Sequence, residues 1–123
     1  EKVITLIMAV NDLSELMLCR EDIVTLLVNL LDNAIEACEK LDENRIIQFE
    51  MMLEEGELTI SVRNPLKEPV VIMGKRLQTT KEKKDNHGLG MLNINSVIEK
   101  NQGTSILECQ DGWFYFSAVI PEV

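Results

Sequence analysis

The sequence has few of the residues that build common metal and disulfide sites. It contains one histidine, His87, which excludes a zinc site made of several histidines. Its three cysteines, Cys19, Cys38 and Cys109, are odd in number and widely spaced, so they predict neither a disulfide framework nor a metal-binding pair. We therefore expect free, mostly buried thiols in a reducing compartment.

Long apolar runs and an excess of positive charge are also missing. The longest apolar stretches, near Val3–Val10 and Ile23–Leu31, are interrupted well before the roughly 20 apolar residues that a membrane helix needs. The net charge of −9 argues against a nucleic-acid partner, because phosphate contacts need a basic face. The first residues lack the basic, apolar and small-residue pattern of a secretory leader, so none is expected. A length of 123 residues with 46% hydrophobic content predicts a single domain, residues 1–123.

Positive charge is concentrated in one segment. Five of the 12 basic residues lie between Lys75 and Lys84. They belong to a polar stretch of roughly twenty residues after Pro65, a length more typical of functional loops or lids than of ordinary connections. A basic loop in an acidic chain suits a small anionic ligand, and a solvated charged loop explains the charge equally well.

Apolar periodicity predicts two helices. The first, Glu21–Lys40, has an apolar face at Ile23, Leu27, Leu30, Leu31, Ala34 and Cys38. The second is expected to begin at Gly88 and to stop at Gly103. Its apolar positions are Leu89, Leu92, Ile94, Val97 and Ile98.

Alternating apolar residues predict strands around these helices. The first is Val3–Val10, followed by a hairpin of Arg45–Leu53 and Leu58–Arg63. A second hairpin joins Thr104–Gln110 to Trp113–Ile120. Helices placed among mostly antiparallel strands predict an α+β fold, a two-layer sandwich with a mixed sheet and helices on one face.

Polar side chains repeat along the first expected helix. Asn29 and Asn33 are four residues apart, and Asp22, Asn29 and Glu36 are spaced by seven, which places all four near one side. A solvated face accounts for such a stripe in most helices. The alternative is a row of amide donors and oxygen ligands, which Mg²⁺ accepts together with waters and phosphates.

A glycine pair stands where the long loop meets the second expected helix. Gly88 and Gly90 let the backbone approach an anion, and a helix start offers unpaired N–H groups. The pair lacks the third glycine of a dinucleotide motif and the Gly-Lys-Ser/Thr of a P-loop. It is compatible with a triphosphate, but many helices begin after a glycine.

Together these segments resemble the Bergerat-fold, or GHKL, ATP-binding domain of sensor histidine kinases. NLLDNAIEA, at Asn29–Ala37, is similar to the N box of that family, and HGLGMLNI, at His87–Ile94, to its second glycine box. The closing WFYFSAVIP resembles the last strand, so the resemblance covers about Val3 to Pro121. With TTK before the glycine box, the set is most similar to the peptide-pheromone and quorum-sensing receptor kinases.

The resemblance implies ATP and Mg²⁺ as cofactors and assigns roles to residues. Asn33 would be the main metal ligand, and Asn29 a second polar group at the metal and phosphates and the catalytic candidate. Lys81, in the lid, would contact phosphate. The nucleotide would also contact the glycine box, which comprises His87, Gly88, Leu89 and Gly90. Related ATPases have a water-activating glutamate at the Asn29 position, and an amide cannot act as that base, so phosphoryl transfer to a protein is implied.

The first glycine box of the family is absent. Asn64 stands where the family has an aspartate that accepts a hydrogen bond from the adenine amino group, and its side-chain carbonyl can accept the same bond without charge. Phe114 stands where many members have a threonine beside the base. Each substitution has a simpler explanation, a turn cap for Asn64 and a core position for Phe114.

The resemblance implies the catalytic domain of a sensor histidine kinase, cut from a longer membrane protein. It would transfer the γ-phosphoryl group to a histidine on a separate helical dimerisation segment. The partners implied are that segment, a response-regulator receiver domain and, in the full-length protein, a second copy. The expected location is the bacterial cytoplasm, with membrane attachment only through the missing sensor part. The alternatives are a nucleotide-gated interaction module, an anti-sigma-type serine kinase, or a degenerate domain that does not bind ATP.

Overall fold

The computed structural model describes the backbone of residues 3–67, 71–73, 76–78 and 85–122, and the side chains of residues 3–67 and 90–122. Its helices are α1 (Arg20–Glu39) and α2 (Asp85–Lys100). Its strands are β1 (Thr5–Val10), β2 (Ile46–Glu54), β3 (Glu57–Pro65), β4 (Val71–Met73), β5 (Arg76–Gln78), β6 (Thr104–Gln110) and β7 (Trp113–Pro121).

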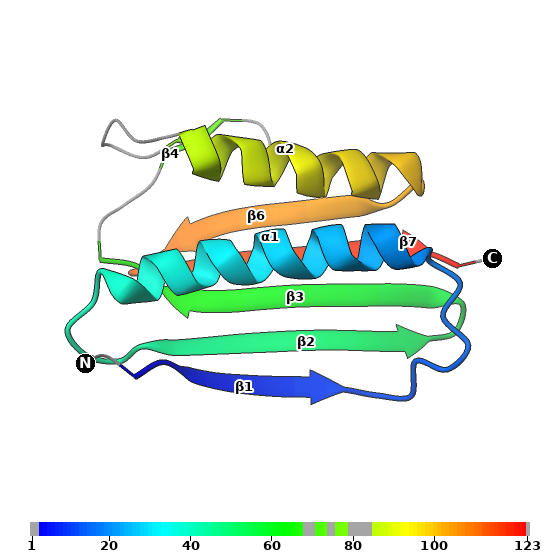
Figure 1. Cartoon of the computed structure of the whole chain (residues 1–123), viewed down its shortest axis with the longest axis horizontal. Helices are drawn as coiled ribbons and strands as arrows, with labels where there is room; N and C mark the ends of the chain where they lie inside the picture. Colours follow the sequence, from blue (N-terminus) through cyan, green and yellow to red (C-terminus); the bar gives the residue numbers. More distant parts are fainter. Residues whose placement is uncertain (1–2, 68–70, 74–75, 79–84, 123) are drawn as a thin grey trace.

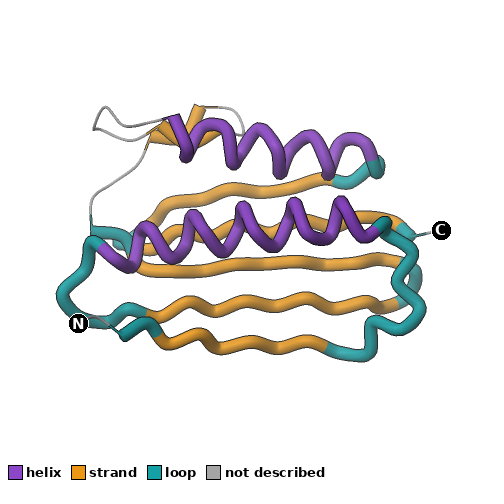
Figure 2. Tube along the Cα trace, viewed as in Figure 1, coloured by secondary structure: helices purple, strands orange, loops and turns teal. Residues whose placement is uncertain are grey.

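Five strands form one mixed sheet in the order β1-β2-β3-β7-β6, and both helices lie on the same face of it (Figure 1, Figure 2). Strand β1 runs parallel to β2, and the other neighbours are antiparallel. Strands β4 and β5 form a separate two-stranded sheet. The architecture confirms the predicted α+β sandwich. Among the described residues, no helix is long and apolar enough to cross a membrane.

Two tight turns fix the register of the antiparallel strands. Glu55 and Gly56 link β2 to β3, and Asp111 and Gly112 link β6 to β7. All four residues have positive φ, between 51° and 80°. Two-residue turns of this kind have a twist that matches that of the flanking strands, and Asp-Gly is among their preferred sequences. Both predicted hairpins are confirmed.

The core lies between the helices and the sheet. From the sheet, the buried side chains are Ile47, Phe49, Met51, Leu58, Ile60, Val62, Phe114, Phe116, Ala118 and Ile120. From the helices they are Leu26, Leu30, Ala34, Cys38, Met91, Ile94, Val97 and Ile98. The expected positions Ile23, Leu27 and Leu31 are only partly buried, and Leu92 is 44% exposed. The buried stripe of α1 is displaced from the expected one because α2 covers only one flank of the helix.

The start and end of α2 differ from the expectation. The helix begins at Asp85 instead of Gly88, so both glycines of the pair lie inside it. Asp and Asn favour helix starts, and a glycine costs a helix interior only about 1 kcal/mol. At the other end, Gln102 takes the left-handed conformation, with φ of 60°, and Gly103 N–H donates to Ile98 O. This is a Schellman cap with glutamine at its left-handed position.

All three cysteines are free, as predicted. Cys38 is buried and Cys109 is half-buried, whereas Cys19 is exposed. Burial raises the pKa of the Cys38 and Cys109 thiols, which keeps them protonated and unreactive at neutral pH.

Candidate functional site

The two asparagines of the polar stripe face α2. A Cβ atom placed on Gly90 would lie 3.3 Å from Asn29 Oδ1 and 3.6 Å from Asn33 Oδ1. Both asparagines are half-buried, and Gly90 is buried. The stripe therefore points toward the helix that carries the glycine box, and it is not simply a solvated face.

Gly90 permits a close approach between the two helices. A methyl group there would sit against both amide oxygens, so α2 comes nearest to the α1 amides where it has no side chain. The unpaired N–H groups at the start of α2 belong to residues 85–88, which include Gly88 but not Gly90. These N–H groups therefore lie beside the Gly90 contact and not within it.

The amide of Asn33 has unused hydrogen-bonding capacity. Its Nδ2 is buried, and no described residue accepts a hydrogen bond from it. The neighbouring Asn29 Nδ2 is already used, because it donates to Thr25 O at 2.7 Å within α1. A buried donor without an acceptor is costly, and an anion beside Asn33 would remove that cost.

Asn64, on the sheet, also has a buried side-chain atom that no described residue hydrogen-bonds. It is 1% exposed near the end of β3, and its Nδ2 donates to Pro65 O at 3.0 Å. Its Oδ1 is buried and receives no hydrogen bond from any described residue. Phe114 pairs with Asn64 on the adjacent strand and is part of the core. The contact with Pro65 uses only the donor of Asn64 and leaves its acceptor free.

The elements that carry these groups come together at one end of the molecule. Asn64 shares the helix-facing side of β3 with buried Ile60 and Val62. The end of β3, the C-terminal half of α1 and the start of α2 lie together at the left of Figure 1. Within the described side chains, no group of three or more His, Cys, Asp and Glu residues could hold a metal. A cation here would depend on amide oxygens, waters and phosphate.

The remaining predicted site residues are only partly described. Lys81 lies outside the described residues. His87, Gly88 and Leu89 belong to the first two turns of α2, and their side-chain environments are also outside the described part. Their roles stay predictions.

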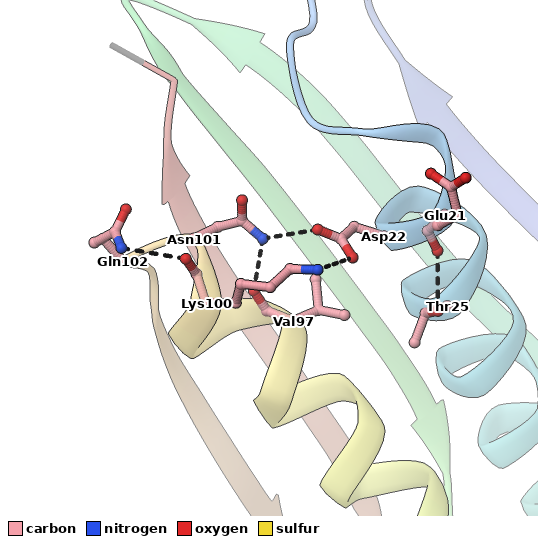
Figure 3. A network of polar contacts seen from close by, with 7 residues as sticks. All are labelled: Glu21, Asp22, Thr25, Val97, Lys100, Asn101 and Gln102. Atoms are coloured by element: carbon pink, nitrogen blue, oxygen red, sulfur yellow. Dashed lines mark hydrogen bonds and ion pairs between the residues drawn. The ribbon is translucent and has the colours of Figure 1, made fainter.

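Asp22 has a different role from the one its spacing suggests. It is 5% exposed, and its carboxylate accepts hydrogen bonds from Lys100 Nζ at 2.9 Å and Asn101 Nδ2 at 3.1 Å (Figure 3). This Asp22 cluster joins the start of α1 to the end of α2, whereas Asn33 lies near the start of α2. The helices are thus antiparallel, and the cluster fixes the end opposite the amides. The hydrogen bonds from Lys100 and Asn101 lower the pKa of Asp22, and Asp22 raises the pKa of Lys100.

Replacing Asp22 with alanine is expected to reduce the free energy of unfolding by about 1–2 kcal/mol at neutral pH, because two hydrogen bonds to a charged group are lost. The folded-state pKa of Asp22 lies below its ordinary value of 3.8. The contribution of Asp22 to the free energy of unfolding is therefore complete above that pH and disappears as pH falls through the lower folded value.

Urea unfolding of the unmodified domain and of Asp22→Ala, from neutral to acidic pH, measures this contribution. The difference in free energy of unfolding between the two proteins should shrink below about pH 4. Asp32→Ala, on the exposed side of α1, is the matched control. A difference that persists at low pH would contradict the role of the carboxylate.

Comparison with known proteins identifies the family. The profile of the GHKL domain matches residues 18–121, which is most of the chain. The chain belongs to the GHKL domain family. The match includes α1, the glycine box and every strand of the main sheet except β1. No curated protein sequence matches the chain.

Solved structures of histidine kinases share the fold. The catalytic domain of histidine kinase ThkA, in a nucleotide-free form, superposes with a TM-score of 0.68 at 22% identity, over 97% of this chain and 79% of that one. The mycobacterial sensor histidine kinase MprB gives 0.60 at 16% identity, over 96% and 83%. The histidine kinase AdeS of Acinetobacter baumannii gives 0.64 at 15% identity, over 97% of this GHKL domain but 54% of AdeS. The predicted fold and the predicted GHKL family are confirmed.

Proposed function

We propose that this GHKL domain binds Mg·ATP and acts as the catalytic domain of a sensor histidine kinase. The observation that supports this most is the pair of amides, Asn29 and Asn33, that face Gly90 of α2. An aliphatic pair would pack a helix interface at lower cost than two amides, one of which has an unused buried donor.

The amides suit a metal-bound triphosphate. Asn33 Oδ1 would coordinate Mg²⁺, while its Nδ2 would donate to a phosphate oxygen. Asn29 would present only its Oδ1, because its Nδ2 is held by Thr25. The free N–H groups in the first turn of α2 would bind phosphate, and Lys81 in the lid would add positive charge. The bound cation would supply charge neutralisation to the phosphates.

Asn64 suits the adenine. Its buried Oδ1 needs a donor, and the exocyclic amino group of adenine is one. A neutral acceptor would replace the aspartate of related domains. Phe114, which is buried opposite Asn64 on the adjacent strand, would form part of the base site. This shortened arrangement supports assignment to the peptide-pheromone and quorum-sensing receptor kinases.

The chemistry would be phosphoryl transfer and not hydrolysis. The site offers an amide at Asn29 where a water-activating carboxylate would be needed, and an amide cannot accept the proton. Phosphoryl transfer depends mostly on positioning and charge neutralisation, which amides, backbone N–H groups and lysine can provide. The acceptor would be a histidine on a helical dimerisation segment of a cytoplasmic, membrane-anchored kinase, and a response-regulator receiver domain would accept the phosphoryl group next.

Mixing the purified domain with the helical phosphoacceptor segment of the same kinase and Mg·ATP labelled at the γ-phosphate tests this function. We expect label on the segment that is lost in acid and retained in alkali, as phosphohistidine is. A segment with its histidine replaced by alanine is the control and should remain unlabelled. Acid-stable label would indicate the serine kinase instead. ATP binding without transfer would indicate an interaction module, and absence of ATP binding would indicate a degenerate domain.

A further inference from the structure

Strand β1 is an edge strand that lacks the usual protection against pairing. It has β2 on one side and no neighbour among the described strands on the other. Its sequence, TLIMAV, contains neither charge nor proline. The exposed fractions of its large side chains are 45% for Leu6, 51% for Ile7, 52% for Met8 and 48% for Val10. Edges of native sheets are normally blocked by charge, proline or a covering element, because free N–H and C=O groups pair with other strands.

The opposite edge of the same sheet is protected. Strand β6 alternates between exposed and half-buried positions, and Glu108 lies among its exposed residues. Its other exposed side chains are polar except for Ile106, which is 57% exposed. A single exposed apolar residue is normal on a protein surface, whereas four in a six-residue strand are not.

The apolar surface continues from β1 onto α1. Register with β2 places Leu6, Met8 and Val10 on the sheet face that the helices cover elsewhere. Neither of the two described helices lies over β1, and Figure 1 shows α1 and α2 displaced toward the β7 and β6 side. The flank of α1 turned away from α2 carries Val24, Val28 and Ile35, which are 52%, 51% and 38% exposed. Together with β1, these residues supply seven of the eleven exposed large hydrophobic side chains in the described part of the chain.

We propose that β1 is a self-association edge, on which a second copy of this domain pairs through its own β1 about a two-fold axis. Another strand can pair with the whole row of outward N–H and C=O groups of β1 while it covers the apolar side chains. A helix laid over Leu6, Met8 and Val10 would leave those groups and Ile7 uncovered. Two antiparallel β1 strands extend the sheet continuously and place the helices of both copies on one face.

The sequence of β1 suits pairing with itself. In an antiparallel pair, opposite residues point to the same face, so the Leu6, Met8 and Val10 sets of the two copies contact one another on the helix side. Ile7 contacts the other copy on the opposite face. Two copies that each carry −9 repel one another, and the uncharged edge is where that repulsion is least. The amides of α1 face the other way, toward α2, so this interface leaves the proposed nucleotide site open and does not depend on it.

Sedimentation equilibrium of the domain, from low micromolar to millimolar concentration, tests the proposal. We expect a reversible monomer–dimer equilibrium that Met8→Lys weakens at least about tenfold, because lysines on neighbouring strands repel and a charge opposes burial. Ile106→Lys, the same change at an exposed apolar position on the protected edge, should leave the equilibrium unchanged. Circular dichroism checks that both variants are folded. A monomer at every concentration, or a dimer that survives Met8→Lys, would overturn the proposal, and so would weakening by Ile106→Lys alone.

Discussion

Replacing Asn33 with alanine is expected to weaken Mg·ATP binding at least about tenfold while leaving the fold intact. Asn33 Oδ1 faces Gly90 and would be lost as a metal ligand, and its unpartnered Nδ2 would be lost as a phosphate donor. The same substitution removes a buried unsatisfied donor, so the free energy of unfolding should not fall by much. Calorimetric titration with a nonhydrolysable ATP analogue, with and without Mg²⁺, measures the effect.

A matched control separates the metal role from a general effect of losing an amide. Asn93 is exposed on α2, and Asn93→Ala should leave the affinity unchanged. In Asn33→Ala the difference between titrations with and without Mg²⁺ should largely vanish. If Asn33→Ala and the unmodified domain bind Mg·ATP equally, Asn33 is not a metal ligand.

Replacing Gly103 with alanine is expected to lower the free energy of unfolding by about 2–3 kcal/mol, because the site is overpacked. A Cβ atom there would lie 2.7 Å from the backbone oxygen of Val119 and 3.0 Å from Ile120 Cγ1. Val119 is paired with β3 on one side and β6 on the other, so its carbonyl cannot move without disturbing two ladders. Guanidinium unfolding, followed by circular dichroism, measures the loss.

Gly112→Ala is the matched control for Gly103. Gly112 has a φ of +80°, and an added Cβ would meet nothing within 4 Å. Its substitution should therefore cost only the backbone strain of a left-handed alanine, about 1 kcal/mol. A Gly103→Ala protein as stable as Gly112→Ala would show that the sheet yields at this point more easily than the contacts indicate.

Local pattern was enough to predict most of the fold. The strands and both hairpins follow from alternating apolar residues and from Asp111-Gly112, because these signals act over a few residues. Spacing alone also placed Asn29 and Asn33 on one side of α1, but not toward α2. The resemblance to a family assigned both amides and the glycine box to one nucleotide, and the observed orientation of the amides toward Gly90 agrees with that assignment.

Features that depend on distant residues were not predictable in the same way. Asp22 was grouped with the amides because of its spacing, yet its partners, Lys100 and Asn101, are far along the chain. Gly103 was expected to stop α2 through its backbone freedom. Instead Gln102 takes the left-handed conformation, and Gly103 is needed for its contact with β7. Sequence periodicity also could not show that no described element covers the flank of α1 beside β1.

The central claim is that a metal-bound nucleotide lies beside the two amides of α1. Nuclear magnetic resonance of a ¹⁵N-labelled domain, with Mn²⁺ and a nonhydrolysable ATP analogue in place of Mg·ATP, tests it directly, because the paramagnetic ion broadens nearby signals. We predict loss of the side-chain amide signals of Asn29 and Asn33, while those of Asn11 and Asn101, at the opposite end of the molecule, remain. Nucleotide binding that leaves Asn29 and Asn33 sharp would contradict the proposed site.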